Sequence, residues 1–184
     1  MSPLFLRVRK LMRLIFFSKL LFIILMSSHV HARGVYQEPD AFLQDSFENN
    51  IPKARVIWLT TDVRPVVEKI LGHKPSVLRI RYWKKEQRTA WILEEIGKDK
   101  PITTGVVINQ GRIERVKVLV FRESRGWEVR HGFFTDQFKG ASINSERHLD
   151  KTIDGISGAT LSVRALRKLS RLALYLDSQV KNKE

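Results

Sequence analysis

An apolar stripe near the C-terminus constrains the fold of this chain more than any other feature. Its members recur at spacings of three and four, and they are Ser162, Ala165, Leu166, Leu169, Leu172, Ala173, Leu176 and Val180. This spacing predicts a long amphipathic helix with one buried face. The opposite side carries four basic residues, Arg164, Arg167, Lys168 and Arg171. We interpret them as a solvated face, although positive charges in the first turns oppose the helix dipole, a conflict that a bound anion would relieve.

Upstream of this helix, four runs rich in β-branched and aromatic residues predict strands. They lie at residues 77–83, 89–96, 102–108 and 113–121. The last two flank the turn Asn109–Arg112 and therefore predict a hairpin. Within the final run, Val116, Val118 and Val120 alternate as the residues of a half-buried strand do.

Two shorter helices are predicted before the strands. The first covers Ala41–Phe47, and the second begins with Thr61 as its cap, holds Pro65 in its first turn and ends at Gly72. Strands with helices before and after them predict an α+β domain. We expect an antiparallel sheet of about four strands, with flanking helices and a long C-terminal helix.

The N-terminus has the pattern of a secretory signal peptide over residues 1–32. Basic residues precede a short apolar run at residues 20–26, and the tripeptide Val30-His31-Ala32 places small residues at the positions that a signal peptidase reads. We therefore expect cleavage after Ala32 and a periplasmic protein. The alternative is a retained membrane anchor, but the apolar run is shorter than the ~20 residues that a spanning helix needs.

Charge and composition exclude several classes of protein. The chain has 33 basic and 19 acidic residues and a net charge of +14; cleavage would remove five basic residues and no acidic one, which leaves +9. Export excludes nucleic acid as the partner of this charge and favours anionic membrane surfaces or acidic proteins. The chain has no cysteine, so disulfides, iron–sulfur clusters and covalently attached haem are excluded. The mature chain's three histidines, His73, His131 and His148, are too scattered to predict a metal site.

The stretch Ser157-Gly158-Ala159-Thr160 runs directly into the predicted C-terminal helix. The first N–H groups of a helix have no partner within it, so this turn predicts a phosphate site that Gly158 and Ala159 leave open to close approach. The alternative is that Ser157 or Thr160 only caps the helix.

The longer string Asp154–Ser162 resembles the flavinylation motif D-x-x-S-G-A-T-x-S/T of the FMN-binding domain family. That family includes extracytoplasmic subunits of sodium-pumping NADH:quinone reductase and of Rnf complexes. The resemblance implies that Thr160 carries FMN through a phosphoester bond installed by a separate flavin transferase. It also implies that Ser157, Gly158, Ala159, Leu161 and Ser162 contact the cofactor. A carboxylate repels a phosphodiester, so we assign Asp154 to recognition by the transferase rather than to the cofactor; the alternative is that it caps the turn.

Two further segments resemble elements of the same family. Residues 134–140 are similar to its F-x-x-Q-F-x-G element, and residues 122–128 occupy the place of its glutamate–threonine–proline–glycine loop. This loop implies cofactor contacts for Glu123, Ser124, Arg125 and Trp127, but it departs from the family in having Arg125 for proline and Trp127 for an aliphatic residue. Arg125 would favour a reduced, anionic flavin, and Trp127 is either a ring that stacks on the flavin or a core aromatic.

The resemblance divides the mature chain into an N-terminal extension, residues 33–88, and an FMN-binding domain, residues 89–184. We found no nucleotide fingerprint, no second cofactor motif and no catalytic constellation. A tethered flavin then predicts an electron-transfer protein whose partner is a membrane or periplasmic redox protein, such as a cytochrome or a membrane reductase. Two alternatives stay open: a flavin-dependent reductase of a small exported substrate, and a non-catalytic sensory domain that binds flavin.

Overall fold

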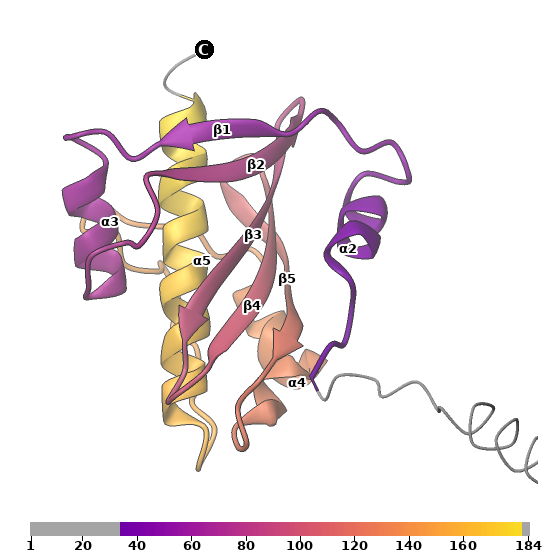
Figure 1. The fold of residues 1–184 in the computed structure, drawn as a ribbon, viewed down its shortest axis with the longest axis vertical. Helices are drawn as coiled ribbons and strands as arrows, with labels where there is room; N and C mark the ends of the chain where they lie inside the picture. Colours follow the sequence, from indigo (N-terminus) through magenta and orange to yellow (C-terminus); the bar gives the residue numbers. More distant parts are fainter. Residues whose placement is uncertain (1–33, 182–184) are drawn as a thin grey trace, which may run out of the picture. The chain divides into compact units, whose positions relative to one another are not determined.

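The computed structural model describes residues 34–181, which contain a five-stranded antiparallel sheet in the order β1-β2-β3-β4-β5 (Figure 1). The strands are β1 Arg55–Trp58, β2 Arg79–Lys85, β3 Arg88–Ile96, β4 Pro101–Asn109 and β5 Arg112–Phe121. The prediction of an α+β fold with an antiparallel sheet is confirmed. The additional strand is β1, which the sequence did not indicate because it has four residues, of which only Ile57 is buried.

The long C-terminal helix, α5 (Thr160–Lys181), lies along one face of the sheet, with α3 (Arg64–Leu71) beside it (Figure 1). Every residue of the predicted apolar stripe is buried. They pack against large side chains of the strands, including Tyr82, Trp91, Ile102 and Val106. The prediction of a long helix with a buried apolar stripe is therefore confirmed. The prediction of a single buried face holds only for the first half of α5, because residues 172–177 are all buried.

The opposite face of the sheet carries a second, smaller core under α2 (Pro39–Ser46). Phe42 of this helix lies against β4 at Gly105, where a Cβ atom would come within 2.6 Å of the ring. Glycine at position 105 therefore allows the aromatic ring to lie directly on the strand. The predicted first helix is confirmed, with its start at Pro39 instead of Ala41.

The predicted hairpin joins β4 to β5 through Gln110 and Gly111, which both have positive φ angles of 53° and 78°. The alternation predicted for β5 is correct for Val116 and Val118, which are buried against α5. It is wrong for Val120. Thr103 pairs with Val120 but Thr104 pairs with Val118, and this bulge turns Val120 towards the α2 side.

The helix α3 begins later than its sequence predicts. Its N-cap is Val63, without a capping side chain, and residues 61–63 form a turn in which the N–H of Arg64 donates to the carbonyl of Thr60. The predicted cap at Thr61 is therefore wrong. Pro65 does lie in the first turn, and Gly72 ends the helix in a left-handed conformation with φ 76°.

Between β5 and α5 the chain forms three short turns of helix, η1 (Trp127–Arg130), α4 (Gly132–Thr135) and η2 (Asp136–Phe138). The predicted signal peptide lies outside the described residues. Within residues 34–181, no helix combines the length and the apolar character needed to cross a membrane. Strands β1 and β2, which come from the segment assigned as an N-terminal extension, belong to the same sheet as β3, β4 and β5.

Candidate cofactor site

The N-terminal end of α5 and the loop after β5 enclose a pocket of about 600 Å³. Its lining residues are Lys98, Glu123, Ser124, Arg125, Gly158, Ala159, Thr160, Leu161 and Ser162. This volume lies within the ~300–1,000 Å³ typical of small-molecule sites. The structure thus brings together two segments, separated by more than thirty residues, that the sequence assigned to one site. Ser157 and Trp127 are not part of the lining.

Thr160 is the first residue of α5 and is exposed. Within the part of the chain that the structure describes, the hydroxyls of Ser157 and Thr160 have no hydrogen-bond partner, so neither residue acts as a side-chain cap. The N–H groups of the first turn have no partner inside the helix, and the dipole of this 22-residue helix adds positive potential at the same end. The geometry fits an anionic group beside the Thr160 hydroxyl.

Gly158 and Ala159 serve different purposes in this turn. Gly158 has a φ angle of +79°, and a Cβ atom there would meet no atom within 4 Å. The positive φ angle therefore favours glycine at this position, whereas a larger side chain would not clash with any neighbouring atom. Ala159 is buried, and its N–H donates to the carbonyl of Ile156, which closes the turn before the helix begins.

The loop after β5 lies directly on the first turn of α5 because residue 126 is glycine. Gly126 has a φ angle of +83°, and a Cβ atom there would lie 2.5 Å from the hydroxyl of Ser162. Ser162 itself is buried. This contact fixes the distance between the two walls of the pocket.

Glu123 has a structural role at the rim of the pocket. Its Oε1 accepts hydrogen bonds from the N–H groups of Lys98, Asp99 and Lys100, at 2.5, 2.7 and 2.9 Å. Burial opposes the charged form, but these three hydrogen bonds and the charge of Lys98 outweigh it and lower the pKa of Glu123. The carboxylate therefore holds the β3–β4 turn, and with it Lys98, beside the pocket. No pattern in the sequence indicated Lys98, which lies in an ordinary polar turn.

Replacing Glu123 by alanine will leave those three N–H groups without their acceptor and lower the free energy of unfolding by about 1–2 kcal/mol. The contribution is present above pH 4.5, the ordinary pKa of the group, and is lost as the pH falls through the lowered pKa of the folded state. Urea unfolding at pH 7 and pH 3 measures both effects. Glu123→Gln, which keeps an acceptor oxygen, is the matched control; equal stability of Glu123→Ala and wild type at pH 7 would disprove this role.

Trp127 lies neither in the pocket nor in the core. Its side chain is 43% exposed, so the interpretation as a core aromatic is wrong. The centres of its ring and of the His131 ring are 5.3 Å apart in an edge-to-face arrangement, and the guanidinium of Arg130 lies 4.9 Å from the centre of the Trp127 ring. Arg125, in contrast, does line the pocket, so that the site has two cationic side chains, Arg125 and Lys98.

Residues 134–140, which resemble F-x-x-Q-F-x-G, position Asp154, the first residue of the stretch that resembles the flavinylation motif. Phe134 and Phe138 are buried with their rings 5.6 Å apart, and Gln137 between them accepts a hydrogen bond of 2.6 Å from the N–H of Asp154. The side chain of Asp154 is exposed and does not line the pocket.

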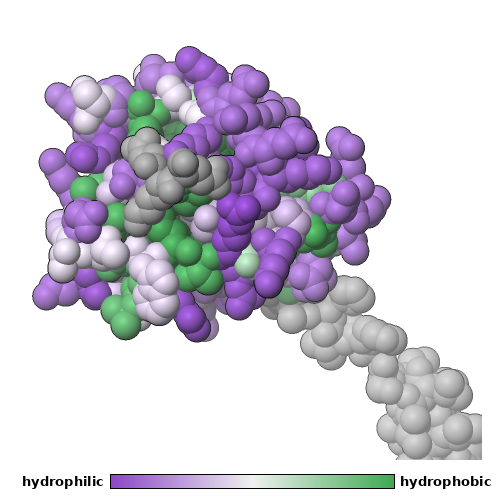
Figure 2. Space-filling view, turned by 90° about the horizontal axis from the view of Figure 1, so that it is seen from above, coloured by the Kyte–Doolittle hydropathy of each residue, from purple (hydrophilic) through white to green (hydrophobic). Residues whose placement is uncertain are grey.

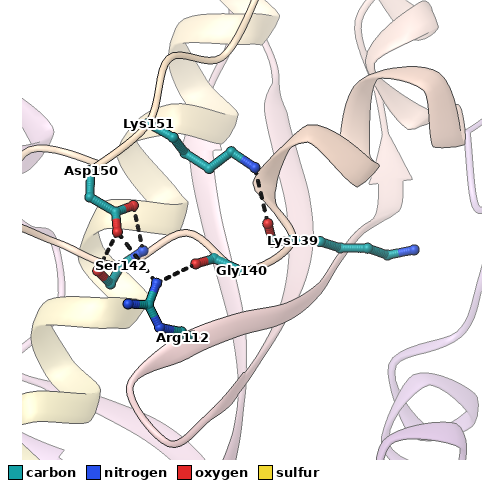
Figure 3. Close-up of polar contacts among 6 residues, drawn as sticks. All are labelled: Arg112, Lys139, Gly140, Ser142, Asp150 and Lys151. Carbon is teal, nitrogen blue, oxygen red and sulfur yellow. Dashed lines mark hydrogen bonds and ion pairs between the residues drawn. The ribbon is translucent and has the colours of Figure 1, made fainter.

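Polar contacts brace the loop that leads from this segment to the motif (Figure 3). Asp150 accepts hydrogen bonds from the N–H and the hydroxyl of Ser142, at 2.8 and 2.7 Å, and these bonds lower the pKa of Asp150. Arg112 donates to the carbonyl of Gly140 at 2.8 Å, and Lys151 donates to the carbonyl of Lys139 at 3.1 Å. Residues 139–151 are thereby tied to the β4–β5 hairpin.

Three of the four basic residues of α5 are not part of a solvated face, contrary to our interpretation of the sequence. Arg167 donates to the carbonyl of Ile153, and Arg171 donates to the carbonyl of Arg147 at 2.7 Å. Lys168 pairs at 2.9 Å with the buried carboxylate of Glu95. Only Arg164 is exposed. The basic side of α5 therefore binds the loop that precedes the helix and the end of β3. These contacts could not be predicted from the spacing of residues along the helix.

Comparison with known families supports the same region of the chain. Residues 97–175 match the family model described as the FMN-binding domain. All of the residues that line the pocket fall within this match. No curated protein and no solved structure matches the chain.

Proposed function

Because residues 97–175 match the FMN-binding domain family, we propose that the protein carries FMN on Thr160 through a phosphoester bond and works as an exported electron carrier. The observation that supports this most is that Thr160, inside the matched domain, lies exposed at the start of α5 and lines a pocket of about 600 Å³. FMN, when bound, would supply electron exchange in one- or two-electron steps.

The residues of the pocket fit a phosphorylated ligand. The open N–H groups at the start of α5 would bind phosphate oxygens, and Lys98 and Arg125 would balance their charge. Arg125 would also stabilise a reduced, anionic ring. Ser124 and Ser162 would provide hydroxyls on the two walls, while Leu161 would present an apolar surface.

A separate flavin transferase is the partner that this proposal requires for maturation. Within residues 34–181, the Thr160 hydroxyl makes no hydrogen bond to a histidine or carboxylate that would activate it, so the transferase must supply the chemistry. Asp154 suits recognition by that enzyme, because its carboxylate is exposed, outside the pocket and held in place through Gln137. Asp154 would therefore affect the labelling reaction without contacting the bound cofactor.

Export and the redox partner belong to the same proposal. The signal-like N-terminus would deliver the chain to the periplasm, and covalent attachment would prevent the loss of a cofactor that is not resupplied there. The basic mature chain would then exchange electrons with a membrane or periplasmic redox protein, such as a cytochrome or a membrane reductase.

Stopped-flow reduction and reoxidation of the purified holoprotein distinguish an electron carrier from the alternatives. We expect exchange with a cytochrome and no sustained turnover of small acceptors. Many turnovers of a small molecule would indicate a reductase instead. A flavin that cannot be reduced and reoxidised by any protein partner would contradict electron transfer and favour a sensory domain.

A further inference from the structure

A cluster of exposed aromatic side chains lies immediately beside the pocket. We call Tyr36, Trp127, His131 and Phe133, together with Arg130, the aromatic cluster. The ring of His131 contacts those of Trp127 and Phe133 with centres 5.3 and 6.2 Å apart, and Arg130 lies between Tyr36 and Trp127, 4.1 and 4.9 Å from their centres. The side chains are therefore held in one arrangement by their own contacts.

Three of the aromatic rings are exposed on one surface. Tyr36, Trp127 and Phe133 are 39%, 43% and 65% exposed. Tryptophan, tyrosine and arginine are the residues that dominate the binding energy of protein interfaces, and large apolar groups gathered on a surface indicate a site of interaction. Because the rings are already ordered, binding would cost little side-chain entropy.

The guanidinium of Arg130 has no acidic partner in the cluster. Within the described residues, Arg130 has neither an ion pair nor a hydrogen bond, and its Nε atom is buried without a partner. Among the acids of the same segment, Asp136 pairs with Lys139 at 3.0 Å, and Glu128 lies beside Arg130 in η1. Glu38 and Asp40 follow Tyr36 at the start of α2. A partner that supplies carboxylates would complement this surface.

The aromatic cluster is continuous with the pocket. Trp127 follows Gly126, whose backbone contacts Ser162 of the pocket. Leu161, which also lines the pocket, is 38% exposed and extends the apolar surface. Figure 1 shows α4 at the same end of the molecule as the start of α5, while β1 lies at the other end. A protein docked on the cluster would therefore cover the rim of the cofactor site.

We propose that the aromatic cluster is the docking surface for a redox protein with an acidic patch, whose carboxylate pairs with Arg130. This inference rests on the proposed function. With a cytochrome as partner, oxidation of one fully reduced flavin reduces two ferric haems to ferrous, and the protons of the flavin pass to water.

A binding experiment without flavin tests the docking surface by itself. An acidic soluble c-type cytochrome is titrated into the full chain produced without a transferase, and amide NMR shifts and the Kd are recorded. We expect shifts at η1 and α4, weaker binding at high salt, and a loss of roughly tenfold or more in affinity for Arg130→Glu or Phe133→Ala.

The chain contains a matched control in the pair formed by Trp58 of β1 and Arg79 of β2. Trp58 is 55% exposed with Arg79 5.5 Å from its ring, so Arg79→Glu makes the same charge change in a similar pair away from the pocket. We expect it to alter affinity much less than Arg130→Glu. No binding of the cytochrome, equal losses for both variants, or binding only to phosphatidylglycerol vesicles would overturn the proposal.

Electron transfer from the loaded protein separates this inference from the proposed function. Arg130→Glu should slow reoxidation by the cytochrome at least roughly tenfold and leave reoxidation by uncharged benzoquinone unchanged. Fast reoxidation by the cytochrome in this variant would overturn the docking surface and leave the electron carrier intact. Binding at the cluster without any electron transfer would support the docking surface and contradict the carrier.

Discussion

Replacing Thr160 by alanine will abolish covalent flavin and leave the fold intact. The substitution removes the only hydroxyl at the proposed attachment position, in a side chain that is exposed and free of hydrogen bonds within residues 34–181. The apolar face of α5 is untouched, so the free energy of unfolding should change by no more than about 0.5 kcal/mol. In-gel flavin fluorescence after denaturation measures the label, and urea unfolding measures the fold.

Three further variants show that the loss is specific to Thr160. Ser157→Ala removes a neighbouring hydroxyl of the same motif that does not line the pocket; because the Thr160 hydroxyl remains, the label should be reduced at most and not abolished. Thr160→Ser keeps a hydroxyl and should retain partial labelling. Asp154→Ala should lower labelling without touching the attachment atom. Flavin that resists denaturation in Thr160→Ala would show that the attachment position is wrong.

A large loss of stability outside the site is expected when Thr89 is replaced by valine. Its hydroxyl accepts a hydrogen bond from Trp91 at 2.9 Å and donates one of 2.7 Å to the carboxylate of Asp177, which is 1% exposed and pairs with Lys181 at 3.1 Å. Thr89→Val would leave the indole N–H and one carboxylate oxygen buried without that partner. We expect a loss of about 2–4 kcal/mol in the free energy of unfolding.

Two other variants make this prediction specific. Thr89→Ser keeps the hydroxyl and should cost about half as much or less, mainly for the missing methyl group. Thr103→Val removes a hydroxyl that donates to Glu94 and accepts from Arg122, two exposed side chains that water can solvate, and should cost about 1 kcal/mol. Urea unfolding followed by tryptophan fluorescence compares them. Equal losses for Thr89→Val and Thr103→Val would contradict an anchoring role for this buried chain of hydrogen bonds.

The elements with a regular pattern could be predicted from the sequence. The stripe of α5 and the hairpin turn at Gln110 and Gly111 depend on spacing and on local backbone conformation, both of which are visible in neighbouring residues. β1 could not be predicted, because its single buried residue gives no period. The position of Val120 depends on a bulge, which is a property of the pairing between two strands.

In the site, too, features formed by neighbouring residues could be predicted, and features formed by residues far apart in the sequence could not. The stretch from Ser157 to Ser162 is contiguous, so its place at a helix start could be read directly from the sequence. The role of Glu123 depends on a turn more than twenty residues away, and Arg130 acquires its importance only when Tyr36 and Trp127 lie on either side of it. Contacts of this kind depend on the folded chain and leave no local signal.

The mass of the peptide that contains Thr160 is the most direct test of the account. The protein is coexpressed with a flavin transferase, purified from the periplasm, denatured and digested with trypsin, which releases residues 152–164. We predict that this peptide gains the mass of one FMN less one water and that fragmentation places the gain on Thr160. The intact mass of the undigested protein should correspond to a chain that begins at Arg33. An unmodified peptide in the presence of an active transferase would contradict covalent flavin at this site.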